Sequence, residues 1–271
     1  MKPFLAVVSG GLIAASVAAG AAHAQTDAPS DPQAGTVFGY KLNIALRGWI
    51  APTYDGSKHV GPAPGGSLAV TKPSDFDFFA APDDAASFSV LNTRHFSLGV
   101  AASVREYRGN KNELEGMRSI GWSIQGGGYL NYWPTPWLRM HAEALKGLTS
   151  QSGLQVNTSV DAVAQPGRWR LAAGPRFGWG DDKFNNTYFG VTPAEAIASP
   201  RIANPYVARA GAHFAGLEAS AEYKWRRQWR LTFDARYHRL LGDDANSPLV
   251  RQLGAPDQFS VSTGVRVMLP N

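Results

Sequence analysis

Cysteine is missing from this chain of 271 residues. Its absence excludes disulfide bonds, and it excludes a lipid anchor attached to a cysteine at a cleavage site. Beyond residue 24, no stretch approaches the roughly 18 consecutive apolar residues that a membrane-spanning helix needs. The net charge is only +5 and no block of five like charges occurs, so we expect no nucleic-acid partner.

Residues 1–24 have the pattern of an export signal. Lys2 gives a short positive start, residues 4–22 are mostly apolar or small, and Ala22-His23-Ala24 has the small-x-small form of a cleavage site. A membrane anchor helix is the alternative, but the run ends in this site rather than in a basic stop. We therefore expect a signal peptide over residues 1–24, a flexible polar lead-in over residues 25–36 and one folded domain over residues 37–271.

The rest of the chain is dominated by alternation of apolar and polar residues. In residues 229–240, one face carries Trp229, Leu231, Phe233, Ala235 and Tyr237, and the other carries Arg230, Thr232, Asp234, Arg236 and His238. Residues 259–269 alternate in the same way. Because successive side chains of a strand point to opposite sides, this period of two predicts two antiparallel strands, each with an apolar and a polar face.

The same alternation recurs along the chain. Clear segments are residues 40–50, 95–105, 120–132, 138–144, 154–162, 168–179 and 208–223, and shorter strands are expected at 67–71, 76–80 and 87–92. Residues 52–57 are expected to turn the chain, and residues 61–66 are rich in Pro and Gly. The clear segments have about the ten residues that cross a bilayer at a tilt. The fold predicted is therefore an all-β, transmembrane, antiparallel up-and-down β-barrel of about 12 strands.

The polar faces of these strands carry many charges. The predicted lumen charges are Arg139, Glu143, Arg170, Arg176, Glu222, Arg230, Asp234, Arg236, His238 and Arg266. A soluble lipocalin-like barrel or sandwich would also alternate, but its small core could not hold such charges unpaired. A barrel with lipid outside and water inside is favoured, which implies outer-membrane lipid and the barrel-assembly machinery as partners and a Gram-negative outer membrane as location.

One long stretch, residues 180–206, does not alternate. Within it, Thr192-Pro193-Ala194-Glu195 has the residues of a helix start, with Thr192 as N-cap, Pro193 as first helical residue and Glu195 closing a capping box. We predict one short helix, about Pro193–Ala198, in a long loop.

Three motifs carry a resemblance to a known family. The family-motif residues are Pro52, Tyr54, Gly56 and Ser57 in the first, Tyr188, Phe189, Gly190 and Val191 in the second, and Gly242, Asp243, Ser247 and Pro248 in the third. In this order and spacing they resemble the MipA/OmpV family of outer-membrane proteins, named for a protein that interacts with a murein transglycosylase. The third motif contains one extra Asp. The resemblance implies a non-enzymatic scaffold that holds a murein hydrolase and a murein synthase near the wall.

The last strand resembles the signal that the insertion machinery reads in such barrels. The residues concerned are Gly264, Val267 and Leu269, with Leu269 in the place of the usual terminal aromatic residue. We expect this strand to pair with residues 40–50 and so to close the barrel.

Two other functions compete with the scaffold. Inward arginines would favour anions in a narrow open pore. Asp234 and His238, four residues apart on one face, would suit a hydrolase at the rim, but a lumen charge network explains them better, because spacing alone shows no convergent geometry. Asp181-Asp182 offers too few oxygens for calcium, the scattered histidines lack metal spacing, and no cofactor is expected. Residues 188–191 are either an exposed docking segment or, as we favour, a packed or plugging loop.

Overall fold

The structure is a computed structural model that describes residues 36–37, 40–71, 79–105, 107–149 and 153–268. All of them belong to one unit, residues 31–271. The predicted signal peptide, the predicted lead-in up to residue 35 and Leu269 of the predicted insertion signal lie outside the described residues and stay predictions.

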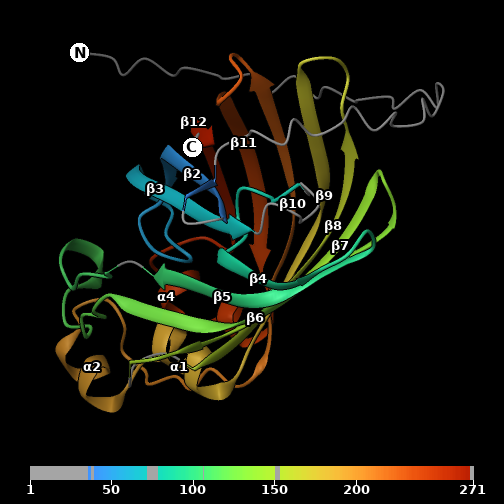
Figure 1. The fold of residues 1–271 in the computed structure, drawn as a ribbon. Coiled ribbons are helices and arrows are strands. Elements are labelled where there is room, and N and C mark those ends of the chain that lie inside the picture. The colour runs from blue at the N-terminus through green and yellow to red at the C-terminus, as the bar shows by residue number, and fades with distance from the viewer. Residues whose placement is uncertain (1–35, 38–39, 72–78, 106, 150–152, 269–271) are drawn as a thin grey trace, which may run out of the picture. The chain divides into compact units, whose positions relative to one another are not determined.

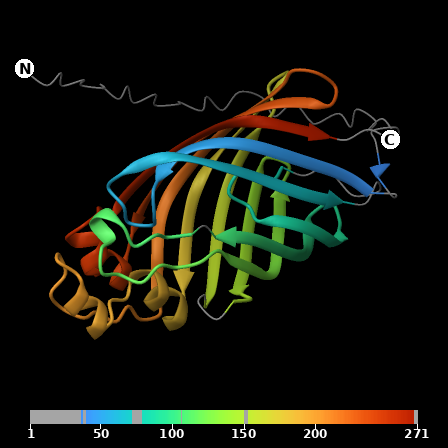
Figure 2. The same cartoon turned by 90° about the vertical axis from the view of Figure 1, so that its left-hand side faces the viewer.

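Twelve strands form one sheet, drawn in Figures 1 and 2. The strands are β1 (Thr36–Val37), β2 (Tyr40–Pro52), β3 (Val60–Thr71), β4 (Ala86–Asn92), β5 (Phe96–Arg105), β6 (Ser123–Thr135), β7 (Leu138–Gly147), β8 (Leu154–Ala164), β9 (Trp169–Gly180), β10 (Gly211–Lys224), β11 (Trp229–Leu240) and β12 (Asp257–Met268). Neighbours in sequence pair with one another from β3 to β12, β12 pairs with β2, and β2 pairs with β3. The strands from β2 to β12 therefore close into a ring, which confirms the predicted barrel of about 12 strands.

The closing pair is also confirmed. β12 runs antiparallel to β2, with Val261 opposite Ile50 and Val267 opposite Ile44. One pair departs from the predicted topology, because β3 and β4 run parallel over Ala69 and Val70. Eleven strands make up the ring when the short β1 is left aside, and an odd number of strands cannot close with every neighbour antiparallel. The parallel pair is the consequence of that odd number.

The short strand expected at 67–71 is part of the longer β3, which also contains the Pro- and Gly-rich residues 61–66. β3 pairs with β2 along its whole length but with β4 only at Ala69 and Val70. Pro62 and Pro64 lack an N–H group, and prolines are tolerated in a strand where no neighbour needs that donor. The strand predicted at 76–80 is wrong at residues 79 and 80, which have no strand structure; residues 76–78 lie outside the described part of the chain.

The two faces of the sheet differ as their alternation predicts. In β5 the exposed Phe96, Leu98 and Val100 alternate with the inward Ser97 and Ala101. Apolar side chains cover the outer face elsewhere too, among them Leu46, Ile50, Val104, Ile124, Leu130, Leu171, Leu217, Phe233 and Phe259. Such an outer face suits hydrocarbon, while strand pairing satisfies the backbone groups that a bilayer cannot hydrate.

None of the helices in the described part of the chain is both long and apolar enough to cross a membrane.

Short helices gather at one end of the strands (Figure 1). They are α1 (Asp182–Phe189), α2 (Pro193–Ala198), α3 (Gly242–Asn246), α4 (Pro248–Arg251) and the 3-10 helix η1 (Asn112–Leu114). Together with the β2–β3 connection, residues 53–59, they form what we call the cap. The predicted α2 is confirmed with its capping box, but the prediction of a single helix is wrong. The sequence did not predict the other helices because they are short. In addition, α1 is polar apart from its last two residues and Phe184.

The opposite end, which we call the turn end, is made of the connections at residues 93–95, 136–137, 165–168 and 225–228. Trp137 is exposed there, as an aromatic belt requires. Trp133 differs, because it is buried against Phe79, Val163 and Ala172 in the lumen. The alternation of β6 accounts for this, because Gln125, Asn131 and Trp133 are buried on one face while Ile124 and Tyr132 are exposed on the other.

Candidate functional site: the lumen and the cap

The centre of the lumen is organised around Arg139, which is fully buried. Its Nη2 donates to Asp84 Oδ2 at 2.5 Å, its Nη1 to Asp161 Oδ2 at 3.1 Å and its Nε to Asn131 Oδ1 at 2.9 Å. A buried guanidinium is tolerated only when it is paired and hydrogen-bonded in this way. The residue predicted as a lumen charge from β7 is therefore the hub of a network.

The network continues around the wall through Arg176 on β9. Its Nη1 lies 2.8 Å from Asp161 Oδ1 and its Nε donates to Asp83 Oδ2 at 2.8 Å. Glu218 on β10 lies 3.5 Å from Arg176 Nη2 and accepts from Arg236 Nε at 2.9 Å. Asp161 thus joins the two central arginines, and Glu218 joins the second of them to β11.

A second cluster lies nearer the turn end, with Glu222 at its centre. Glu222 Oε1 accepts from Arg230 Nη1 at 2.7 Å and lies 3.8 Å from Arg170 Nη1, while its Oε2 lies 2.9 Å from Arg266 Nη1. Four of the predicted lumen charges therefore meet in one group, because they stand on the neighbouring strands β9 to β12.

Asp234 and His238, the rim-hydrolase candidates, have separate surroundings. Asp234 accepts a hydrogen bond from Ser262 Oγ on β12. The His238 ring lies 5.1 Å from the Phe214 ring, centroid to centroid. Among the described residues, no hydrogen bond or ion pair joins Asp234 to His238. Glu143 instead contacts a histidine, with its Oε2 3.5 Å from His141 Nε2.

Residues 79–85, which we call the strap, run inside the barrel between β3 and β4. The strap touches strands on several sides of the wall. Arg47 Nη1 on β2 donates to the Pro82 carbonyl at 3.0 Å, and Arg266 Nη2 on β12 to the Ala80 carbonyl at 3.4 Å. The Arg139 guanidinium lies over the Phe79 ring, 5.6 Å from its centroid. With Asp83 bound to Arg176 on β9, the strap crosses the lumen and is anchored on several strands of the wall.

Sequence reasoning missed the strap and several of its partners. Asp83 and Asp84 carry no periodic signal, so nothing local marks them as inward. Arg47, Asp161 and Glu218 stand on the polar faces of alternating segments, so the period places them on the lumen side, but it does not show that they join the network.

A cavity of about 180 Å³ lies between the strap and the cap. Asp83, Asp84 and Arg176 line it on the strap side, and Asp55, Arg105 and His213 line it on the cap side. We call it the chamber. Among the described residues, no group of three or more His, Cys, Asp or Glu side chains is arranged to hold a metal ion.

The cap brings the three family motifs together, although they are far apart in sequence. Gly56 N donates to Gln258 Oε1 at 3.2 Å, and Ala255 N donates to the Gly56 carbonyl at 2.9 Å. Gly56 has φ +93°, and a Cβ there would lie 2.6 Å from Val250 Cγ2. Ser247 Oγ donates to the Phe189 carbonyl at 2.6 Å. These contacts explain why the first motif needs glycine and the third needs serine.

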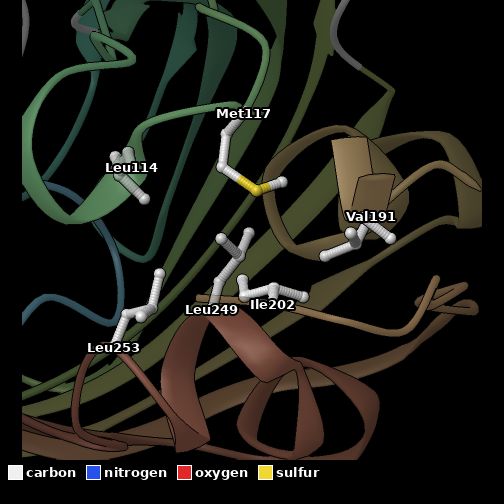
Figure 3. Close-up of a cluster of buried hydrophobic side chains, with 7 residues drawn as sticks. Leu114, Met117, Val191, Ile202, Leu249 and Leu253 are labelled. Atoms are coloured by element: carbon white, nitrogen blue, oxygen red, sulfur yellow. The ribbon is translucent and has the colours of Figure 1, made fainter. Parts of the chain in front are cut away.

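The second motif is packed rather than exposed. Phe189 is fully buried and Tyr188 nearly so, and both pack with Phe184, Ile120 and Val250. Val191 joins a second core with Leu114, Met117, Ile202, Leu249 and Leu253, whose side chains point toward one another in Figure 3. Residues 188–191 are therefore a packed segment of the cap and not an exposed docking segment.

A buried carboxylate fastens α2 to the connection between β5 and β6. Glu195 accepts from Thr192 N and Thr192 Oγ1 at 2.8 Å, and from Arg118 N at 2.8 Å and Arg118 Nη1 at 3.1 Å. Burial by itself would raise the pKa of Glu195, but the hydrogen bonds from Thr192 and Arg118, together with the Arg118 charge, lower the pKa below its usual value. We call this contact the cap latch.

The described connections of the turn end carry charge of one sign. Its exposed charged residues are Arg94, Arg168, Lys224, Arg226 and Arg227. The described connections at this end contain no acidic residue. Exposed tryptophans lie beside the cations, and the Arg226 guanidinium sits 5.4 Å from the ring centroid of Trp225. This surface combines positive charge with aromatic side chains.

Comparison with known proteins agrees with this architecture. A family model described as MltA-interacting protein MipA matches residues 44–267. No curated protein sequence matches the chain.

Solved outer-membrane barrels resemble the fold at very low identity. An outer membrane channel from Pseudomonas putida F1 is 10% identical, with 89% of this chain and 99% of that one covered and a TM-score of 0.44. The NanC porin is 7% identical, with 85% and 99% covered and a TM-score of 0.39. The outer membrane protease OmpT of Escherichia coli is 9% identical, with 85% and 96% covered and a TM-score of 0.36. With TM-scores this low, none of these similarities carries an argument about function.

Proposed function

Because this chain belongs to the MltA-interacting protein MipA family, we propose that it is a non-enzymatic scaffold that holds a murein hydrolase and a murein synthase at the outer membrane. The family description supplies the first partner, since it names an interaction with MltA. The proposal extends that interaction to this chain and adds the synthase as the second partner.

The protein is an outer-membrane β-barrel, and its two ends differ in a way that supports a docking role. Outer-membrane barrels have short connections on the periplasmic side and long ones outside. By this rule the turn end faces the periplasm, where murein enzymes work, and the cap faces outward. Both chain ends of the barrel, the start of β2 and the end of β12, then lie on the periplasmic side as well.

The observation that carries the proposal is the basic and aromatic surface of the turn end. Arg94, Arg168, Arg226 and Arg227 attract an acidic partner, and complementary charge raises both the rate and the selectivity of docking. Exposed Trp225 and Trp137 offer the large side chains that dominate many interfaces. We therefore expect the partner to present an acidic patch.

The two competing functions have less support. An anion pore needs open space and unpaired cations, whereas the strap fills the lumen and carboxylates pair its central arginines. A rim hydrolase needs Asp234 and His238 together, and the described structure gives them different partners. If the rim-hydrolase interpretation held, His238→Ala would abolish a measurable hydrolysis of lipid or peptide; the scaffold proposal expects no such activity to lose.

Cross-linking of intact envelopes followed by capture of the protein tests the scaffold. Murein hydrolase and synthase should be recovered with the natural chain, and their repeated absence would overturn the proposal. The double substitution R226E/R227E should reduce recovery at least fivefold, since it reverses charge at the centre of the turn end. Its matched control is K58E/K111E, which reverses two exposed lysines at the cap end and should leave recovery unchanged.

A further inference from the structure

The strap lies in the lumen without being part of the wall. Among the described residues, no backbone hydrogen bond joins residues 79–85 to a strand. The strap is held by side chains instead, through Arg47 and Arg266 on its carbonyl groups and through Glu143, whose Oε2 accepts from Ala85 N at 3.2 Å. Removing it would therefore break no ladder of the barrel.

The arginines beneath the strap keep partners of their own in the wall. Asp161, on β8, contacts both Arg139 and Arg176. Glu218, on β10, contacts Arg176 and Arg236. If the strap leaves, these contacts hold the guanidinium groups in place, so the site does not depend on the strap for its shape.

The two central arginines share their wall carboxylates. Asp161 lies between Arg139 and Arg176, and Glu218 is shared by Arg176 and Arg236. The strap adds the carboxylates of Asp83 and Asp84, which bind Arg176 Nε at 2.8 Å and Arg139 Nη2 at 2.5 Å. Guanidinium groups fit carboxylates closely because their N–H donors form a rigid fork.

We propose that Asp83 and Asp84 act as an internal ligand, occupying an anion site on Arg139 and Arg176 that takes a small solute carboxylate when the strap is displaced. The inference does not rest on the scaffolding function. The chamber beside the strap limits the solute, because its volume is only about 180 Å³. A carboxylate of a few heavy atoms fits, whereas a sugar chain or a peptide does not.

The absence of cysteine makes the proposal testable in the intact chain. Ser159, on β8, lines the chamber and is buried, so Ser159→Cys places a single, nearly isosteric thiol there. Its reaction with small methanethiosulfonate reagents, one carrying a sulfonate and one a trimethylammonium group, measures access to the chamber. With the natural strap, labelling of the refolded barrel in lipid vesicles should be slow.

The variant D83N/D84N removes both carboxylates of the internal ligand and keeps the size of the side chains. Labelling should become at least tenfold faster, and the sulfonate reagent should outpace the trimethylammonium reagent severalfold. Sodium acetate should then slow labelling relative to sodium chloride at the same concentration. Asp257→Asn, which removes a carboxylate from an exposed pair with Arg239, is the matched control and should leave the rate unchanged.

Each other result counts against the proposal. Equal rates with and without the two substitutions mean that the strap does not seal the chamber through its carboxylates. Faster labelling without protection by acetate, or with preference for the cation, means that the exposed arginines form no anion site. If D83N/D84N loses the heat-modifiable mobility of a folded barrel, the single variants D83N and D84N, each retaining one ion pair, replace it and should give intermediate rates.

Discussion

Asp84 and Arg139 meet in the middle of the barrel, with Oδ2 of the carboxylate 2.5 Å from Nη2 of the guanidinium. One residue belongs to the strap and the other to β7, so this pair ties a segment outside the sheet to the wall. Arg139 is also held by Asp161, and both are fully buried. The pair therefore connects three parts of the chain that are separate in sequence.

Removal of this hub should destabilise the barrel strongly. Arg139→Ala leaves Asp84 without its guanidinium partner and Asp161 with Arg176 alone, and breaking a buried ion pair costs about 3–5 kcal/mol. Urea unfolding from lipid vesicles, followed by tryptophan fluorescence, measures the loss. Arg239→Ala is the control, because its pair with Asp257 is about half exposed and should cost less than about 1 kcal/mol. Equal losses in the two variants would contradict the role of Arg139 as a hub.

Because the first motif packs tightly against Val250, a methyl group added at Gly56 should lower the stability of the fold. Gly56→Ala places Cβ 2.6 Å from Val250 Cγ2 at φ +93°, and overpacking of this kind costs about 1–3 kcal/mol in addition to the backbone strain. Gly167→Ala separates the two effects, because φ is +61° there and nothing lies within 4 Å. Unfolding should show a clearly larger loss for Gly56→Ala, and similar losses would refute the packing argument.

The cap latch should make stability depend on pH in acid. The folded-state pKa of Glu195 is lowered, so its stabilisation is fully present above the ordinary carboxyl value of 4.5. It is lost as pH falls through the lowered pKa of the folded state, since the unfolded chain then binds the proton more tightly. The difference in urea midpoint between the natural chain and Glu195→Gln should therefore be largest near neutral pH and shrink below pH 4.5. A difference independent of pH would rule out the ionised latch.

The filled lumen predicts electrical silence. The strap blocks the lumen between the walls, and the cap covers one end, so the natural protein in a planar bilayer should give a flat trace. Steady unitary steps with anion preference would show that an open path exists and would restore the pore as a function.

Much of the wall could be predicted from local sequence. Strands such as β5 and β11 show their two faces through alternation, and α2 shows its start through Thr192, Pro193 and Glu195. The charges on β7, β9 and β10 follow from the same period. The first half of β3 was harder to predict, because Pro62 and Pro64 are unfavourable in most strands. The strand tolerates them there because its second neighbour pairs with it only at Ala69 and Val70.

The sequence by itself determined which side chains of each strand face lipid and which face the lumen, because that choice depends only on the alternation along one segment. Tertiary structure decided which distant groups meet. The parallel β3–β4 pair follows from the number of strands in the closed ring, and the entry of Asp83 and Asp84 into the lumen follows from the path between those strands. Likewise, Gly56, Phe189 and Ser247 each belong to a local motif, but only the folded cap brings these motifs into contact. Such contacts depend on the closure of the whole ring, and no local pattern of residues encodes that closure.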